Sequence, residues 1–131
     1  MPVLVETITK PCAQDRNDLL QIFADAPAWL LAPHANAEAL IEASMSQGSL
    51  IAGRFNGRLL GAALLQRGEQ AWQLSHLCVR KITRRRGVAK RLLDEACRLA
   101  REAGLPLSLM AADRPEVQAF AARMQLQLIP T

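Results

Sequence analysis

The chain of 131 residues contains no tyrosine, and its aromatic residues are three phenylalanines and two tryptophans. So few aromatic rings leave no evident platform on which nucleic-acid bases could stack. No apolar run reaches the roughly 18 residues that a membrane-spanning helix needs, and the N-terminus lacks a basic stretch followed by an apolar one. We therefore expect a cytoplasmic protein without a secretory signal and without a membrane partner.

Cysteine is also scarce. Cys12, Cys78 and Cys97 are odd in number and lack the spacing of metal ligands, so we expect reduced thiols and no metal site. Half of the residues are apolar, and a chain of this length buries enough surface to fold without a disulfide or a metal. A single domain spanning residues 1–131 is expected.

Two common phosphate-binding patterns are missing: neither the P-loop sequence nor the dinucleotide pattern Gly-x-Gly-x-x-Gly is present. Instead, an apolar run at 74–79 leads through a basic segment into an amphipathic helix. The first turn of a helix has unpaired N–H groups and a partial positive charge, both of which suit phosphate. Gly87 has no Cβ to obstruct a close approach, and arginines add fork-shaped donors. The segment predicts a pyrophosphate site; its residues are Thr83, Arg84, Arg85, Arg86, Gly87, Val88, Ala89 and Lys90.

The basic charge of the chain is concentrated near this segment. The net charge is +4, and seven of the sixteen basic residues lie between Arg80 and Arg91. Such a block could indicate nucleic acid, but a small polyanion explains it more economically in a chain so poor in aromatic residues. Two simpler interpretations stay open: a basic loop that caps a helix, and a solvated basic face at Lys90 and Arg91.

Hydrophobic periodicity predicts an α/β fold with a mixed sheet and the element order β-α-α-β-β-β-α-β-α-β. Asn56-Gly57 predicts a tight hairpin, and the strand-helix-strand connection after it makes the fifth strand parallel to the fourth. Asp15, Asn36 and Asp113 or Arg114 are the expected helix caps, and Trp29 to Leu31 is expected to be a packed loop. The predicted strands are 2–9, 50–55, 59–65, 71–79, 105–110 and 126–129, and the third predicted helix is 87–103, with Val88, Leu92, Ala96, Leu99 and Ala103 on its inner face.

The sequence Arg84-x-x-Gly87-x-Ala89 resembles the Arg/Gln-x-x-Gly-x-Gly/Ala signature of the GNAT superfamily of N-acetyltransferases, whose members bind the pyrophosphate of acetyl-CoA. The predicted element order is also that superfamily's topology. A closer resemblance, to the PanZ (PanM) family, is carried by residues 14–19, 54–60 and 77–88. Members of that family bind acetyl-CoA, promote self-cleavage of the precursor of aspartate 1-decarboxylase (PanD) and inhibit the mature enzyme.

This resemblance implies roles for individual residues. Leu77, Cys78 and Val79 would lie along the pantetheine arm of acetyl-CoA or CoA, and Thr83 to Lys90 would hold the pyrophosphate. Asn56 would lie near the acetyl end, although a role as a turn residue alone is equally open. Ala89 replaces the usual second glycine, and a Gly-Phe expected after residue 120 is missing, which affects the partner surface more than the coenzyme site.

Two functions remain open, a PanZ-like sensor of acetyl-CoA that regulates PanD and an active N-acetyltransferase that acetylates an amine. Amine acetylation needs a base and commonly an acid, yet the chain has no tyrosine and the strand at 71–79 has no carboxylate. His76 is a weak candidate base, with an ordinary pKa of about 6.5, or a structural residue. Cys78 could carry an acyl group, but packing is the simpler role.

Overall fold

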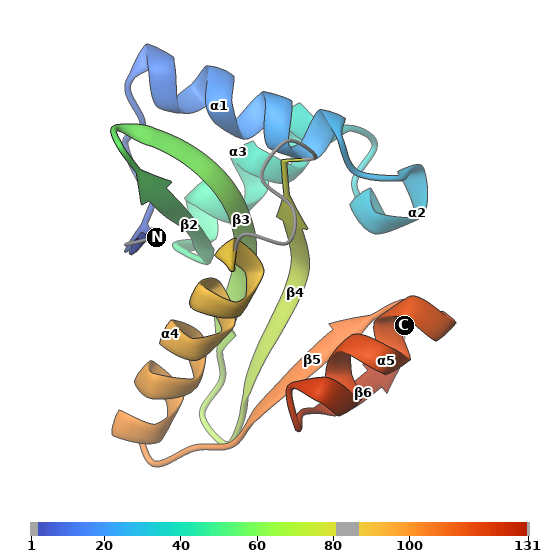
Figure 1. The fold of residues 1–131 in the computed structure, drawn as a ribbon. Helices are drawn as coiled ribbons and strands as arrows, with labels where there is room; N and C mark the ends of the chain where they lie inside the picture. Colours follow the sequence, from blue (N-terminus) through green and yellow to red (C-terminus); the bar gives the residue numbers. More distant parts are fainter. Residues whose placement is uncertain (1–2, 81–86, 131) are drawn as a thin grey trace.

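The computed structural model describes residues 3–80 and 87–130. Its central feature is a six-stranded sheet in which the strands follow one another in chain order (Figure 1). Strands β1 to β4 are antiparallel, whereas β5 is parallel to β4 and β6 is parallel to β5. The strands are β1 (Leu4–Thr7), β2 (Leu50–Phe55), β3 (Arg58–Arg67), β4 (Trp72–Val79), β5 (Leu107–Ala111) and β6 (Gln127–Pro130).

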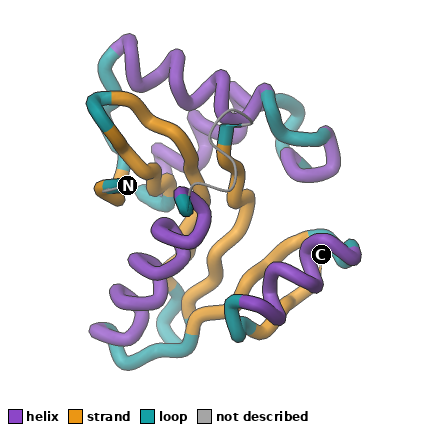
Figure 2. Tube along the Cα trace, in the orientation of Figure 1, coloured by secondary structure: helices purple, strands orange, loops and turns teal. Residues whose placement is uncertain are grey.

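Helices pack on both faces of this sheet (Figure 2). Within the described residues they are α1 (Ala13–Ala24), α2 (Ala28–Leu31), α3 (Ala37–Gln47), α4 (Val88–Glu102) and α5 (Pro115–Arg123). The predicted mixed sheet is therefore confirmed. Among these helices, none combines the length and the apolar character that a bilayer crossing requires.

Two apolar cores lie on opposite faces of the sheet because successive side chains of a strand point in opposite directions. On β3, Ala62 and Leu64 pack with α1 and α3, whereas Ala63 and Leu65 pack with α4. Strand β3 is buried on both faces and holds the two layers of helices together.

The β2–β3 hairpin turns at Asn56 and Gly57, whose φ angles of 53° and 82° confirm the predicted tight turn. Ion pairs fasten this hairpin to α1. Arg54 contacts Glu6 at 2.8 Å and Asp15 at 2.9 Å, and Arg58 contacts Asp18 at 2.7 Å. We call Asp15, Asp18, Arg54 and Arg58 the α1–hairpin cluster. The cluster joins two of the stretches that resemble the PanZ family, residues 14–19 and 54–60.

Two local predictions are wrong. Helix α1 begins at Ala13 rather than after Asp15, and its N-cap is Cys12, whose sulfur accepts the Asp15 N–H at 3.5 Å. Trp29 to Leu31 belong to the one-turn helix α2, which starts after Pro27, and the Leu30 N–H donates to the Pro27 carbonyl at 2.9 Å. A single turn between two prolines leaves too little periodicity for a helix to be recognised.

Helix α4 lies close to the sheet because glycines face it. Gly53 and Gly61 are cross-strand neighbours on β2 and β3, and a Cβ on Gly61 would lie 2.8 Å from a methyl carbon of Val88. No side chain at these two positions separates the first turn of α4 from the strands. The position of the α4 N-terminus is therefore set by the packing of Val88.

The predicted inner face of α4 is right except at its last residue, Ala103, since Leu99 is partly buried against the core. Val88, Leu92 and Ala96 are buried as expected. Ala103 lies beyond the helix as its C-cap and is exposed, because the chain turns into Gly104, which has a φ of 74°. The buried face is completed by Leu93 and Ala100.

Candidate functional site

Strands β4 and β5 pair over only part of β4. Their register runs from Trp72–Leu107 to Ser75–Met110. The next residue, His76, has a φ of 54°, and the β3–β4 register shifts there. Strand β4 therefore bulges at His76, directly after the last residue of its register with β5. Figure 1 shows β5 diverging from β4 beyond the paired segment.

A groove with a volume of about 480 Å³ occupies this divergence. One wall is the end of β4 beyond its register with β5, and the other is α5 with the end of β5. We call it the β4–α5 groove. It is lined, among others, by the predicted site residues His76, Leu77, Cys78, Val79 and Ala89. The structure thus brings together residues that the sequence analysis assigned to the pantetheine arm and to the start of the following helix.

The start of α4 adjoins one end of the groove. Gly87 is the N-cap, with a φ of 82° in the left-handed region that favours glycine. The Val88 side chain packs into the core and is 1% exposed, so only its backbone can face a ligand. The N–H groups of this first turn have no partner within the helix. The predicted residues Thr83, Arg84, Arg85 and Arg86 lie outside the described part of the chain.

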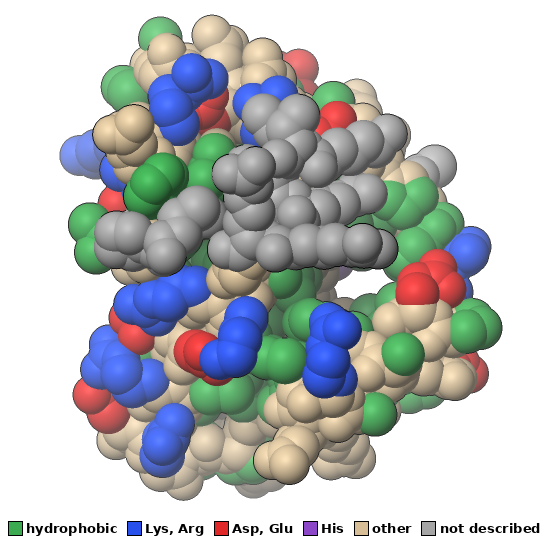
Figure 3. Space-filling view, viewed as in Figure 1, with side chains coloured by type: hydrophobic (Ala, Val, Ile, Leu, Met, Phe, Trp, Pro, Cys, Tyr) green, Lys and Arg blue, Asp and Glu red, His purple; other side chains and the backbone are tan. Residues whose placement is uncertain are grey.

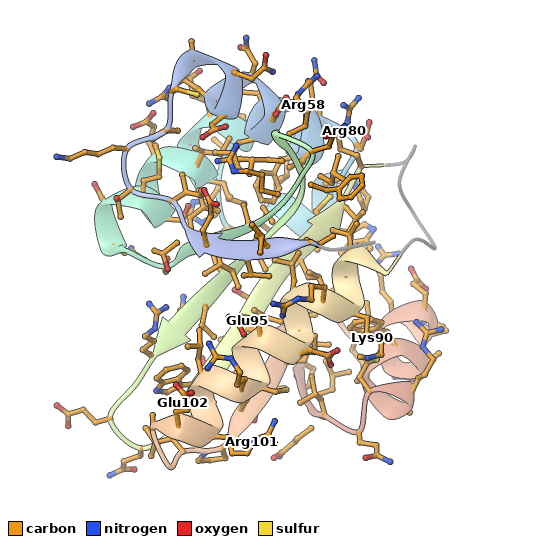
Figure 4. All side chains as sticks on the ribbon, turned by 60° about the vertical axis from the view of Figure 1, so that its left-hand side comes forward. Arg58, Arg80, Lys90, Glu95, Arg101 and Glu102 are labelled. Atoms are coloured by element: carbon orange, nitrogen blue, oxygen red, sulfur yellow. The ribbon has the colours of Figure 1, made fainter. Side chains whose placement is uncertain are left out.

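Lys90, also predicted to hold pyrophosphate, extends from α4 into solvent (Figure 4). Its ammonium group lies 2.7 Å from the carboxylate of Asp94 on the next turn. Other basic residues of this helix are paired too, since Arg98 contacts Glu95 and Glu102. Basic side chains are spread over this face of the molecule (Figure 3), but on α4 acids partly neutralise them. Lys90 is therefore a weaker source of positive field than its sequence position suggested.

His76 makes a hydrogen bond through each ring nitrogen. Nε2 donates to the Ala32 carbonyl at 2.8 Å, and because a carbonyl only accepts, Nδ1 must accept from the Ser75 hydroxyl, 2.9 Å away. Burial lowers the pKa of His76, the Ala32 bond opposes this shift, and the nearby His34 ring lowers the pKa further. The ring is neutral near pH 7, and its one basic nitrogen is already engaged.

Neither of the two other candidates, Cys78 and Asn56, places the functional group of its side chain in the groove. The Cys78 thiol points to α1, where it donates to the Ile22 carbonyl at 3.2 Å, although the residue's remaining atoms line the groove. Asn56 is exposed at the tip of the β2–β3 hairpin and lines neither cavity formed by the described residues. The structure therefore gives Cys78 a packing contact and Asn56 a turn conformation.

Several residues of the groove escaped the sequence analysis. Trp29 and Leu30 on α2 and Val117 and Phe120 on α5 contribute to its walls. The spacing of Val117 and Phe120 predicts the inner face of a helix, but it does not predict that this face lines a groove. The guanidinium of Arg114 stacks on the Trp29 ring with 4.3 Å between the guanidinium carbon and the ring centroid. This contact joins α2 to the loop before α5, across the groove.

A second cavity, of about 660 Å³, lies beyond the bulge of β4. We call it the α3–β4 cavity. Its walls come from the segment around α2, from α3 and from strands β3, β4 and β5. The two cavities are adjacent, because five residues line both of them: Trp29, Leu30, His76, Met110 and Ala111.

The sequence matches the PanZ acetyltransferase (GNAT) domain family over residues 2–127. The chain belongs to this family. No curated protein matches the sequence closely. The PanZ match covers all of the elements described above except the last residues of β6.

Solved structures agree with the fold of a PanZ-family domain. A ribosomal-protein-alanine N-acetyltransferase from Brucella melitensis is 21% identical, with a TM-score of 0.73 over 96% of this chain and 92% of that one. The N-acetylglutamate synthase of Neisseria gonorrhoeae, in complex with coenzyme A and N-acetyl-glutamate, is 21% identical, with a TM-score of 0.67 over 94% of this chain and 28% of that one. A GNAT family acetyltransferase from Elizabethkingia anophelis with acetyl-CoA bound is 16% identical, with a TM-score of 0.66 over 94% and 74% of the two chains. The predicted GNAT fold is confirmed.

Proposed function

We propose that this PanZ-family chain binds acetyl-CoA, or CoA, in the β4–α5 groove. The observation that carries the proposal is the divergence of β4 from β5 after Ser75, which opens a groove lined by the end of β4 and the first turn of α4 inside a domain of this family. The solved relatives from Neisseria gonorrhoeae and Elizabethkingia anophelis hold coenzyme A and acetyl-CoA on the same fold.

The residues present fit such a ligand. The register of β4 with β5 ends at Ser75, before Leu77 and Val79, so the backbone N–H and C=O groups of these two residues can pair with the amides of a pantetheine arm. Gly87 and Ala89 keep the first turn of α4 open to a pyrophosphate. Bound acetyl-CoA would supply an activated thioester.

We further propose that the chain acts as a PanZ-like sensor that binds the PanD precursor, promotes its self-cleavage and feeds back on pantothenate and CoA synthesis. Family membership supports this role, and so does the chemistry of the site. The basic nitrogen of His76 accepts from Ser75, and Glu116, exposed on α5, is the one acid among the described residues that line the two cavities. Such a site is poorly equipped to deprotonate an ammonium group.

Calorimetry measures the binding of the coenzyme and of the partner. Acetyl-CoA should bind this protein, and the PanD precursor should bind this protein only when acetyl-CoA is present. The precursor should also cleave itself faster in this mixture than alone. Amine acetylation is measured in parallel as release of the free CoA thiol across a panel of amines. Thiol release without any PanD binding would establish the N-acetyltransferase alternative and overturn the sensor.

A further inference from the structure

The tip of the β2–β3 hairpin carries a chemically labile pair of residues, Asn56 and Gly57. The backbone nitrogen that follows an asparagine can attack the side-chain Cγ, and a following glycine favours this attack because it has no Cβ to obstruct it. Of the three asparagines in the chain, Asn17, Asn36 and Asn56, only Asn56 precedes a glycine. Asn56 and Gly57 are both exposed, so water has access to the pair.

The other two asparagines lie in settings that hinder this reaction. Asn17 lies inside α1, where the backbone N–H of the next residue takes part in the hydrogen bonds of the helix. Asn36 is the N-cap of α3, and its side-chain oxygen accepts the Ala39 N–H at 2.8 Å. The chain therefore contains its own references for the reactivity of Asn56.

The folded turn holds Asn56 in a conformation that opposes the reaction. Its φ is 53°, and for a residue with a side chain such a φ belongs to the left-handed region, where ψ is positive. Ring closure needs a ψ of the opposite sign, because only then does the Gly57 nitrogen face the Asn56 Cγ. Asn56 must therefore rotate out of the tight turn before it reacts, which requires the tip of the hairpin to open.

The α1–hairpin cluster resists this opening. Arg54 donates to the Gly57 carbonyl at 3.3 Å and is itself held by Asp15 at 2.9 Å. On the other strand, Arg58 contacts the Asp18 carboxylate at 2.7 Å. Both strands of the hairpin are thus anchored to α1 close to the turn (Figure 1). The population of the open tip, and with it the rate of the reaction, depends on these contacts.

We propose that Asn56 is a deamidation site whose reactivity is controlled by the α1–hairpin cluster. The Gly57 nitrogen forms a bond to the Asn56 Cγ, the Cγ–Nδ2 bond breaks, and the amide group leaves as ammonia together with the Gly57 proton. Water then opens the resulting succinimide ring at either carbonyl, so that residue 56 becomes aspartate or isoaspartate. Both products carry a new carboxylate, and isoaspartate also lengthens the main chain of the turn by a methylene group.

The new carboxylate changes the charge balance beside α1. The cluster and its neighbour Glu6 already hold three carboxylates against the two guanidinium groups. A carboxylate at position 56 competes with them for Arg54 and for Arg58, whose side chain is 50% exposed. Deamidation therefore weakens the attachment of the hairpin to α1.

The reaction is tested by incubating the full chain in mildly alkaline buffer. Mass spectrometry of its peptides gives the rate at each asparagine, and a methyltransferase specific for isoaspartate detects that product. We expect conversion at Asn56 but not at Asn17 or Asn36, and in urea Asn56 should convert at least about tenfold faster than in the folded protein. A rate that urea does not change would show that the turn gives no protection. An Asn56 that stays intact in urea, or converts no faster than the other two, would overturn the site.

Asp18→Ala separates the role of the cluster from that of overall stability. It leaves the sequence around Asn56 unchanged and releases Arg58, so the rate at Asn56 should rise at least about fivefold. Gly104→Val, just beyond the C-terminal end of α4, is the matched control, because strain at its φ of 74° destabilises the fold away from the hairpin. In this control the rate should stay within about twofold of that in the unmodified chain. Equal acceleration in both variants, or an unchanged rate in Asp18→Ala, would show that the cluster does not control the reaction.

The consequence for the hairpin is tested on Asn56→Asp, which reproduces one of the products and tolerates the positive φ. In urea denaturation it should unfold at a lower midpoint than the unmodified chain, and the difference should shrink in high salt, which screens exposed charges. Equal midpoints at low salt would contradict the competition for Arg54 and Arg58.

Discussion

Gly87 links the backbone geometry of the site to its proposed ligand. Its φ of 82° is a conformation in which a residue with a side chain is strained by about 1–2 kcal/mol. We expect Gly87→Val to weaken acetyl-CoA binding at least about tenfold, because a branched side chain would stand where phosphate oxygens approach the first turn of α4. Calorimetry measures the affinity and thermal unfolding measures the stability.

Gly104, at the other end of the same helix, provides the matched control for that substitution. It has a similar φ of 74° and lies outside the groove. Gly104→Val should therefore lose comparable stability and keep its affinity for acetyl-CoA. An equal loss of affinity in the two variants would show that strain in α4, and not obstruction of the phosphate site, is responsible.

His76 gives the stability a predictable pH dependence. Its pKa in the folded protein is lowered, chiefly by burial, so the unfolded chain takes up a proton first as the pH falls. The free energy of unfolding should therefore decrease as the pH drops below about 6.5, down to the lower folded pKa. His76→Asn, which tolerates the positive φ, should flatten this part of the profile in urea titrations at pH 5 to 8. His34→Asn is the comparison. If only His34→Asn flattens the profile, the pH dependence comes from His34 and the prediction for His76 is wrong.

At the scale of whole elements, the α1–hairpin cluster should matter more than the surface ion pairs. The Asp18 carboxylate is 1% exposed and accepts the Leu59 backbone N–H at 3.1 Å besides pairing with Arg58. Asp18→Ala leaves that N–H buried without a partner, which should lower the free energy of unfolding by about 1–3 kcal/mol. Arg16→Ala removes the exposed pair with Glu42 and should change stability little. Equal effects in urea denaturation would contradict this ranking.

The same cluster shows where sequence reasoning stopped. The hairpin at Asn56 and the helix after Gly87 follow from local residue types, and both were predicted. Asp15 was assigned to a helix cap because its partner, Arg54, lies 39 residues away, and no local pattern identifies a pairing at that separation. Likewise, the family resemblance assigns Leu77 to Val79 to the pantetheine arm, but the second wall of the groove depends on how far β5 diverges from β4, which periodicity does not encode.

Gly61 tests whether the packing of α4 sets the position of the proposed phosphate site. A Cβ there would lie 2.8 Å from a methyl carbon of Val88 and 3.3 Å from the Cys78 carbonyl oxygen. Gly61→Ala should displace the first turn of α4, cost about 1–3 kcal/mol of stability and weaken acetyl-CoA binding. Adding Val88→Ala should relieve the contact and restore part of the affinity. If the double variant binds acetyl-CoA no more tightly than Gly61→Ala alone, the loss of affinity comes from a displacement of β4 and not of α4.

At the scale of the whole molecule, the groove separates two arms. One arm is the antiparallel sheet with α1, α3 and α4, and the other is the unit of β5, α5 and β6 (Figure 1). At the base they are joined by the β4–β5 register, which ends at Ser75 and Met110. Across the open end, the contact between Arg114 and Trp29 spans the two arms. The width of the groove should therefore depend in part on this cation–π contact.

Arg114→Ala should loosen the open end while leaving the base intact. A contact of this kind contributes about 0.5–2 kcal/mol, so we expect acetyl-CoA affinity to fall roughly two- to tenfold with little change in the urea midpoint. Arg67→Ala is the control, because Arg67 stacks on Trp72 within a single arm and outside the groove. Calorimetry gives the affinities, and the indole NMR signals of the two tryptophans report which ring is disturbed. If both variants bind acetyl-CoA equally well, the two arms are held by their base alone, and the Arg114–Trp29 contact has no part in shaping the site.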